Sequence, residues 1–311
     1  MKIYTSLQEF TSTKKTIVTL GTFDGVHLGH TVILDRICNI AKQENLESVV
    51  LTFFPHPRLI VSNDSEIKLL NTMAEKAKLL EQKGIQNFII HPFDKLFSEL
   101  SPSEFVKQIL IKQLNIQKII IGYDHKFGKN RAADFNDLIA FGNEFGFDVE
   151  EIPAKQVDEV SVSSTKIRNS LLEGNISLAN DYLGYSYMLS GIVVKGNQLG
   201  RTIGFPTANI QISENYKLIP KNGVYMVTTI LNNKIIFGMM NIGIKPTLGE
   251  NLLSIEVHFL HFSEDIYGHK IQVNVMERLR EEQKFESFEV LKSQLEIDKA
   301  NTLHYFENWN A

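Results

Sequence analysis

The segment TIVTLGTFDGVHLGH, residues 16–30, decides how the first half of the chain folds. Its first eight residues form an apolar, β-branched run typical of a buried strand, and a helical pattern of apolar residues begins where the segment ends. Residues 21–30 of the segment contain three glycines and two histidines, His27 and His30. This arrangement is compatible with a phosphate site, a metal site or a structural tight turn.

The same alternation of strand and helix continues to about residue 153. Four further strands are expected, at residues 48–54, 87–93, 118–122 and 147–153. Helical patterns separate the strands, at residues 30–45, 73–84, 101–115 and 135–146. The third helix has a full start signal, with Ser101 as the cap, Pro102 in the first position and Glu104 closing a capping box. Alternation of this kind predicts an α/β, Rossmann-like domain with a doubly wound parallel sheet.

After about residue 184 the segments become short, β-rich and separated by Gly, Asn and Pro. Strands are expected at residues 187–196, 223–230, 234–243, 253–262 and 270–279. The LNN sequence between the second and third of these predicts a hairpin turn. Near the C-terminus, one helical face is expected to contain Phe288, Leu291, Leu295, Leu303 and Phe306. The pattern predicts a small antiparallel β-barrel with a terminal helix, so that residues 1–183 form one domain and residues 184–311 the other.

The composition is that of a globular chain, with 43% hydrophobic and 22% charged residues over 311 positions, a length that favours two domains. The net charge of −4 provides no polybasic surface, so nucleic acid is not an expected partner. Cys38 is the single cysteine, which excludes an internal disulfide, and we expect a buried thiol. The N-terminus lacks the apolar region of a signal peptide, and no apolar run reaches about 20 residues. We therefore expect a cytoplasmic protein.

Ligands of an open α/β sheet bind beyond the carboxyl ends of its strands, which is where residues 21–30 are expected. Glycines let backbone N–H groups approach an anion, and the start of the following helix supplies partial positive charge. His27 and His30 add two donors one turn apart. A metal would need a further carboxylate or thiolate at ligand spacing, and a plain turn would not need two histidines. The favoured interpretation is a phosphate site, although no lysine follows at P-loop spacing.

Two later segments support this interpretation. TFFPHP places His56 after the second strand, where Pro-His-Pro is also compatible with a plain rigid loop. SVSSTKIRNSLL offers the hydroxyls of Ser163, Ser164 and Thr165 at the start of a helix. The same segment places Arg168 in the first turn, where a cation opposes the helix dipole, so this placement favours a bound anion.

A second glycine-rich segment, KGNQLGRTIGFPTANI, occupies residues 195–210. It is either a long barrel loop or a phosphate-binding loop in which Thr207 and Asn209 offer hard oxygen ligands to Mg²⁺. Arg201 suits either a phosphate contact or a solvated surface position. Downstream, Glu256 lies in the alternating pattern LSIEVHFL, and on periodicity alone it is a solvent-exposed carboxylate.

Several motifs occur together and in a fixed order. GTFDGVHLGH, TFFPHP, IGYDHKFG and VSSTKIR resemble the flavin-nucleotide adenylyltransferase module of prokaryotic bifunctional riboflavin kinase/FAD synthetases. GRTIGFPTAN, PKNGVY, MMNIGIKPT, IEVHFLHF and RLREEQKFESFE resemble the riboflavin kinase module of the same family. The resemblance covers essentially the whole chain. It implies ATP-dependent phosphorylation of riboflavin to FMN in the C-terminal domain, and adenylyl transfer from ATP to FMN in the N-terminal domain, which gives FAD and pyrophosphate.

The resemblance also implies roles for individual residues. His27 and His30 match the histidines that stabilise the triphosphate, and Glu256 matches the general base that accepts the proton of the ribityl hydroxyl. Contacts to ATP or its phosphates are expected from Gly21, Phe23, Asp24, Gly29, Ser163, Ser164, Thr165, Arg168, Gly200, Arg201, Gly204 and Pro206. Contacts to the flavin are expected from His56, Asp124, Phe127 and Arg278. Thr207 and Asn209 match the metal–nucleotide motif, so Mg²⁺ and ATP are the expected cofactor and co-substrate.

Two positions depart from the family pattern. His125 stands where phenylalanine is usual, and this change is expected to alter stacking on the flavin. Ala133 stands where glycine is usual, and this change is expected to stiffen the loop. The expected partners are riboflavin, FMN, FAD and ATP, without nucleic acid or membrane, for a monomer or a weak homo-oligomer. Two rival hypotheses are a nucleotidyltransferase for another phosphate-bearing substrate and a flavin-sensing or RNA-binding module without turnover.

Overall fold

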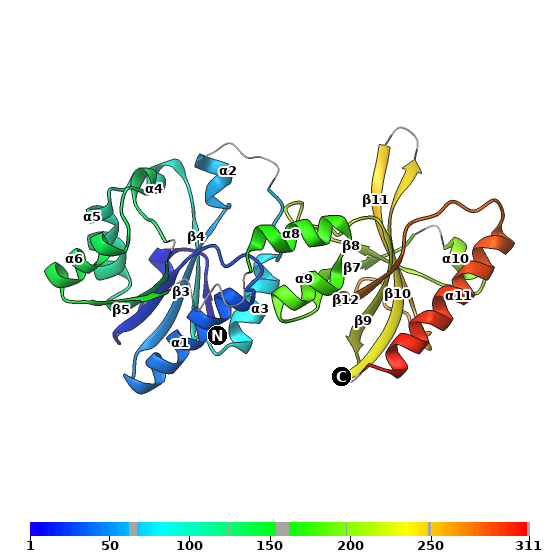
Figure 1. Cartoon of the computed structure of the whole chain (residues 1–311), viewed down its shortest axis with the longest axis horizontal. Coiled ribbons are helices and arrows are strands. Elements are labelled where there is room, and N and C mark those ends of the chain that lie inside the picture. The colour runs from blue at the N-terminus through cyan, green and yellow to red at the C-terminus, as the bar shows by residue number, and fades with distance from the viewer. Residues whose placement is uncertain (62–66, 124, 154–161, 197, 248–249, 310–311) are drawn as a thin grey trace. The chain divides into compact units, whose positions relative to one another are not determined.

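The computed structural model describes residues 1–61, 67–123, 125–153, 162–196, 198–247 and 250–309. The chain forms two compact units, Met1–Ser164 and Thr165–Ala311 (Figure 1). The predicted fold class is confirmed, because the first unit contains a parallel sheet with helices and the second contains a closed antiparallel barrel followed by a helix. The predicted functional division between residues 183 and 184 stays a prediction.

The sheet of the first unit has six parallel strands in the order β1-β4-β3-β2-β5-β6. The strands are β1 (Lys2–Tyr4), β2 (Thr16–Leu20), β3 (Glu47–Phe54), β4 (Asn87–Pro92), β5 (Ile116–Gly122) and β6 (Asp148–Ile152). The five predicted strands are present, and β1 is an edge strand that the sequence analysis missed. Every residue of β2 is buried, as expected for a parallel strand covered on both faces.

Helices connect these strands and cover the sheet. They are η1 (Leu7–Glu9), α1 (Leu28–Gln43), α2 (Pro57–Val61), α3 (Met73–Gln82), α4 (Lys95–Ser98), α5 (Pro102–Glu104), η2 (Phe105–Gln113), η3 (Lys129–Arg131) and α6 (Phe135–Phe145). The apolar face of α1 is buried through Ile33, Leu34 and Ile37. Cys38 lies on the same face, where burial raises the pKa of its thiol, so the predicted buried thiol is confirmed.

The segment from Ser101 to Gln113 is only partly the helix that the sequence predicts. Ser101 and Glu104 form the expected capping box at the start of α5. From Phe105 onward the backbone is π-helical, and the Leu114 N–H donates to the carbonyl of Ile109, five residues back, at 2.9 Å. π-Helices are rare and occur mostly as short bulges within α-helices, so the capping signal and the apolar pattern predict an α-helix here.

The second unit begins with α8 (Ser164–Glu173) and α9 (Ile176–Leu183), followed by the barrel. The barrel strands close in the order β10-β11-β8-β7-β12-β9. Their bounds are β7 (Tyr187–Val194), β8 (Ala208–Gln211), β9 (Gly223–Leu231), β10 (Lys234–Thr247), β11 (Glu250–Phe259) and β12 (Lys270–Arg280). A short helix, α10 (Leu199–Thr202), lies between β7 and β8. The predicted hairpin is confirmed, with Asn232 and Asn233 at φ 50° and 59°, as a primed turn requires.

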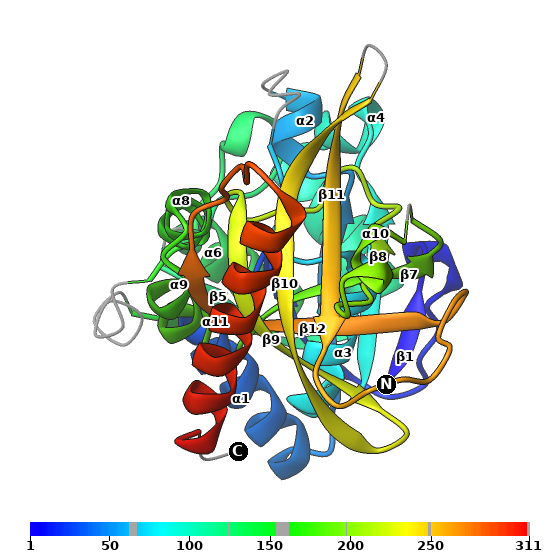
Figure 2. The ribbon, with the colours of Figure 1, turned by 90° about the vertical axis from the view of Figure 1, so that its right-hand side faces the viewer.

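The terminal helix α11 (Phe288–Glu307) lies along the barrel beside β10 (Figure 2). The predicted apolar face is wrong at its start, because the Phe288 side chain is 57% exposed. The buried residues of the helix are Asp298, Thr302 and the predicted Phe306, whereas the predicted Leu291, Leu295 and Leu303 are half-buried. Phe306 stacks on Phe237 of β10 at 4.1 Å between ring centroids. Asp298 on this face forms a buried ion pair that apolar periodicity cannot reveal.

Candidate active sites

Residues 21–30, here called the histidine turn, leave β2 at the topological switch point of the sheet. The chain continues from β2 to β3 on one side and later to β5 on the other, and such points are where open α/β sheets bind ligands. The predicted strand over residues 16–23 ends at Leu20, because Phe23, Gly25 and Val26 have φ values of 43°, 89° and 39°. The turn thus brings His27 to the cap position of α1.

The two histidines of the turn lie against each other. Their rings stack with centroids 3.7 Å apart and planes 19° apart, and Phe23 lies 5.1 Å from the His30 ring. Both Nδ1 atoms are buried, and neither has a hydrogen-bond partner among the residues that the structure describes. Burial lowers the pKa of His27 to about 4 against the opposing charge of Asp24, and burial lowers the pKa of His30 well below its usual value. At neutral pH the turn therefore presents two neutral imidazoles.

Hydrogen bonds from neighbouring elements fix the backbone of the turn. The carbonyl of Thr22 accepts from the Lys76 ammonium at 2.6 Å and from the Thr52 hydroxyl at 3.3 Å. The carboxylate of Asp24 accepts from the Leu70 N–H at 2.9 Å, and Asp24 is 1% exposed. The Ser164 hydroxyl donates to the Asp24 carbonyl at 2.8 Å. Sequence reasoning found Ser164 but missed Lys76, whose helical position looks ordinary.

Glycines of the turn leave room for these side chains. A Cβ atom at Gly21 would lie 3.1 Å from the Phe23 ring, and Gly29 is buried inside the first turn of α1. Both positions fit the predicted crowding around a bound phosphate, and their contacts to ATP stay a prediction.

The second half of the predicted phosphate motif lies on α8. Ser164 begins the helix, Ser163 and Thr165 are exposed, and Arg168 is half-buried one turn later. Thr165 and Arg168 belong to the second compact unit, so their approach to ATP stays a prediction.

The predicted flavin residues of the first unit lie at strand ends. His56 is buried, and its Nδ1 accepts from the Arg58 N–H at 3.2 Å. Phe127 is 7% exposed and pairs with Ala133 through two backbone hydrogen bonds of 3.0 and 3.2 Å. Asp124 lies outside the described residues. The His125 ring is parallel to Phe127 at 6.4 Å, so this departure from the family pattern keeps an aromatic ring there.

An aromatic cluster that sequence reasoning missed follows the ends of β3 and β4. Phe53 lies 5.5 Å from Phe93 and 5.2 Å from Phe97, and Phe97 contacts Phe105 at 6.1 Å between ring centroids. Phe105 contacts Phe127 at 5.7 Å, which connects the cluster to a predicted flavin residue. The segments TFFPHP and IIHPF carried this signal, because both place phenylalanine at the carboxyl end of a strand.

The second candidate site lies where strands β8 and β11 of the barrel pair. The Thr207 hydroxyl donates to Glu256 Oε2 at 3.1 Å, and Asn209 on β8 lies directly opposite Glu256 on β11. Glu256 is half-buried, so the solvent-exposed position that periodicity alone suggests is wrong. The alternation itself is confirmed, because the neighbouring residues Ile255 and Val257 are buried. Thr207, one residue before β8, thus contacts Glu256 on β11, and Asn209 of β8 is the register partner of Glu256.

The loop before β8 is shaped around its glycines and Phe205. The Phe205 N–H donates to the Gly200 carbonyl at 2.8 Å, and the Phe205 ring is buried 5.0 Å from the ring of His258. His258 Nδ1 donates to the Pro206 carbonyl at 2.8 Å, which ties the loop to β11. Three predicted phosphate contacts of this loop, Arg201, Gly204 and Pro206, are exposed, and their role stays a prediction.

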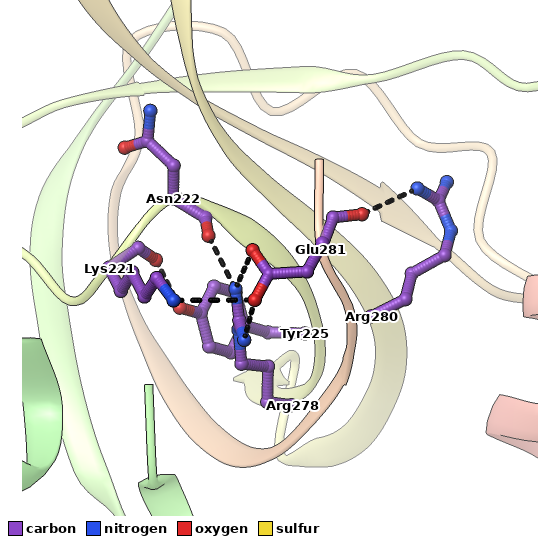
Figure 3. A network of polar contacts seen from close by, with 6 residues as sticks. All are labelled: Lys221, Asn222, Tyr225, Arg278, Arg280 and Glu281. Carbon is purple, nitrogen blue, oxygen red and sulfur yellow. Dashed lines mark hydrogen bonds and ion pairs between the residues drawn. The ribbon is translucent and has the colours of Figure 1, made fainter. Parts of the chain in front are cut away.

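Arg278, a predicted flavin residue, lies in a network of polar contacts at the end of β12 (Figure 3). Its guanidinium donates to the Asn222 carbonyl at 2.8 Å and to Glu281 Oε1 at 2.9 Å. Lys221 also contacts Glu281, at 3.3 Å, and the hydrogen bonds from Arg278 and Lys221 lower the pKa of Glu281 to about 2. Tyr225 donates to the Lys221 carbonyl. These contacts hold Arg278 at the rim, and its contact with flavin stays a prediction.

The donor set of the second site suits magnesium. Mg²⁺ prefers hard oxygen ligands, keeps several waters and takes few protein ligands together with substrate phosphates. The Thr207 hydroxyl, the Asn209 amide and the Glu256 carboxylate offer such oxygens. Among the described residues, no group of three or more His, Cys, Asp or Glu side chains is placed to hold a metal ion.

In the described part of the chain, no helix has both the length and the apolar character that a membrane crossing requires.

The two folded units and the family matches of each define the class of this chain, a two-domain transferase. Residues 9–166 match the FAD synthetase family, and residues 183–306 match the riboflavin kinase family. The chain belongs to the bifunctional riboflavin kinase/FMN adenylyltransferase family, and it is an enzyme with a domain for each activity.

Relatives of that description align over nearly their whole length. The Listeria monocytogenes protein is 38% identical over 96% of this chain and 94% of its own. The proteins of Bacillus subtilis and Escherichia coli K12 are 36% and 35% identical over 94% and 93% of this chain, and 93% and 92% of their own. A solved structure described as a macrolide-efflux protein from Streptococcus pneumoniae matches with a TM-score of 0.87, at 30% identity over 99% of each chain.

Proposed function

We propose that the two reactions of the family occur at the two sites described above: riboflavin phosphorylation at Glu256 and adenylyl transfer at the histidine turn. The observation that carries the assignment is the position of each site within its own family match, the histidine turn in residues 9–166 and Glu256 in residues 183–306. The finer assignments below rest on the chemistry of the residues that meet there.

In the kinase reaction, the 5′-hydroxyl oxygen of riboflavin attacks the γ-phosphorus of ATP. The bond between that phosphorus and the bridging oxygen of ADP breaks, and the hydroxyl proton passes to the Glu256 carboxylate. The hydrogen bond from Thr207 to Oε2 at 3.1 Å orients the carboxylate for this role. FMN and ADP are the products.

Mg²⁺ is the proposed metal of this site. Thr207 and Asn209 would hold it together with the ATP phosphates, and its charge would offset the negative charge of the transferring phosphoryl group. Asn209 reaches this position because Gly196, which lies against its side chain, has no Cβ atom.

In the adenylyl transfer, a phosphate oxygen of FMN attacks the α-phosphorus of ATP. The bond from that phosphorus to the β-phosphate oxygen breaks, which gives FAD and pyrophosphate. His27 and His30 would donate imidazole N–H groups to the triphosphate, and preorganised donors in a site closed to water are the main source of such catalysis. The unpartnered Nδ1 atoms of both rings support this role. Arg168 is the proposed cation on α8.

Riboflavin, FMN, FAD and ATP are the proposed partners, and a monomer or a weak homo-oligomer is the proposed state. The cytoplasm is the proposed location, which suits an enzyme that uses ATP and whose single cysteine is buried and unpaired.

The test follows both products in one reaction. The full chain is incubated with riboflavin and Mg-ATP, and FMN and FAD are separated by chromatography. His30→Ala should stop FAD formation and preserve FMN formation, whereas Glu256→Gln should stop FMN formation and preserve FAD formation from added FMN. We expect each loss to be about 10²-fold or more. His304→Ala, at a histidine whose side chain is 80% exposed, and Glu264→Gln serve as matched controls. Loss of both steps in a folded variant would show that the two-site assignment is wrong.

A further inference from the structure

Lys76 has surroundings that are unusual for a lysine. It lies in the first half of α3, and its side chain is among the largest fully buried ones of the chain, with 2% exposure. A buried ammonium is costly, and its position near the N-terminus of a helix adds an unfavourable dipole interaction. Burial lowers the pKa of Lys76 to about 8, so the side chain remains mostly protonated at neutral pH. Because burial of the Lys76 ammonium is unfavourable for stability, its presence at this position indicates a functional role.

The Nζ atom of Lys76 is directed at the histidine turn. It donates to the Thr22 carbonyl at 2.6 Å, one residue before the strained stretch that begins at Phe23. The end of α3 that bears Lys76 is itself fixed by the capping box of Thr72 and Glu75. The contact therefore ties the backbone of the turn to a rigid helix.

The charge of Lys76 also acts unequally on the two histidines. Asp24 opposes the burial effect at His27, because its negative charge raises the pKa of that ring. At His30 the charge of Lys76 adds to burial and to the charge of His27, and all three lower the pKa. The negative charge of Asp24 also raises the pKa of Lys76 against burial, and the buried Glu75 beside Lys76 on α3 accepts from the Thr72 N–H through Oε2. The charge of Asp24 thus opposes the effect of burial on the pKa of His27, whereas the charge of Lys76 adds to that effect on the pKa of His30.

We propose that Lys76 is a positioning residue for adenylyl transfer: it anchors the histidine turn through the Thr22 carbonyl and places a buried positive charge behind His30. The charge polarises the His30 N–H toward the triphosphate and keeps a second positive charge off that ring. His27 lies beside Asp24 instead, and it donates its N–H to the triphosphate as a neutral imidazole. This inference rests on the proposed function of the histidine turn.

Three substitutions separate the anchor from the charge. Lys76→Arg keeps the hydrogen-bond donor and the positive charge. Lys76→Gln keeps a donor but removes the charge. Lys76→Met removes the donor and the charge but keeps an unbranched side chain of similar length. Lys78→Met, at an exposed lysine of the same helix, is the matched control. Each full-length variant is assayed for FAD formation from FMN and for FMN formation from riboflavin, and the titration of the histidine rings is followed by NMR.

We expect Lys76→Met to lower kcat for FAD formation by about 10²-fold, as a displaced catalytic group does, and to leave FMN formation unchanged. Lys76→Gln should lose less, and Lys76→Arg should stay within a few-fold of the original rate. In the Gln and Met variants the titration midpoint of His30 should move to higher pH, which a purely structural role would not cause. Should Lys76→Met fail to fold, the Arg and Gln pair still decides the question.

The inference is overturned if the Gln variant forms FAD at the original rate, or if its His30 midpoint does not differ from that of the Arg variant. These results differ from a failure of the proposed function, in which the original protein itself forms no FAD or the His30→Ala variant forms it normally.

Discussion

The contact between Gly196 and Asn209 gives the sharpest test of the kinase site. A Cβ atom built on Gly196 would lie 2.7 Å from Asn209 Cγ and 2.8 Å from its Oδ1. Ordinary contacts of such atoms are about 3.5 Å, so the substitution Gly196→Ala must move the amide by most of an ångström. An asparagine side chain moves by rotating about its own bonds, and Gly196 does not need a positive φ. The protein should therefore fold with the amide turned away from Glu256.

A displacement of this size at a positioning group typically costs about 10²-fold in rate. We expect Gly196→Ala to lower kcat/KM for FMN formation by that factor and to raise KM for Mg-ATP. FAD formation from added FMN should be unchanged, which makes the same preparation its own folding control. The assay is the chromatographic separation of the two products.

A double-mutant cycle decides whether Asn209 mediates the loss. If Gly196→Ala acts by displacing the amide, it should cost little once Asn209→Ala has removed that amide. Equal losses in both backgrounds would locate the effect in the loop backbone and refute the reasoning. Normal kinase activity of Gly196→Ala would refute it directly.

Two further predictions concern stability. The pKa of His27 is about 4 in the folded chain against 6.5 for an exposed histidine, so the unfolded state binds the proton first as the pH falls. The free energy of unfolding should fall by roughly 3 kcal/mol between pH 6.5 and 4, and urea denaturation should show a shallower pH dependence for His27→Gln. In the barrel, Asp298→Ala leaves the Arg280 guanidinium without its buried partner at 2.7 Å and should cost about 3 kcal/mol. Arg36→Ala, which breaks the exposed pair with Glu150, should cost under about 1 kcal/mol by the same denaturation measurement.

Local sequence signals predicted most of the fold, because many of its elements are determined by short-range rules. The alternation of strand and helix patterns gave five of the six strands of the first sheet, the Ser101 signal gave a capping box, and an Asn-Asn turn gave the hairpin of the barrel. The same rules failed at Phe288, where the apolar pattern continues past the end of the surface that the barrel offers. They also missed the edge strand β1, which has three residues and little burial.

The sites were predicted less completely, for a physical reason. His27, His30 and Glu256 carry chemistry that motifs make visible, but Lys76 and Lys78 look alike in the sequence. Only the three-dimensional packing of α3 buries one of them and exposes the other. Contacts between residues far apart in the sequence determine which lysine is buried, and such contacts produce no local sequence pattern.

The two sites differ in a way that follows from their attacking oxygens. The ribityl hydroxyl of riboflavin must lose a proton as it attacks, so its site needs a base, and Glu256 is a half-buried carboxylate within the barrel. The phosphate of FMN has a second pKa of roughly 6, so it arrives already ionised and needs no base. In the first unit the carboxylate of Asp24 is buried and accepts a hydrogen bond from the Leu70 N–H, so it is not placed to act as a base. What remains to be stabilised there is the negative charge of the triphosphate, and for this His27 and His30 are suited as neutral donors. The proposed assignment, a base at the barrel and neutral donors at the histidine turn, is the arrangement expected when one nucleophile carries a proton and the other does not.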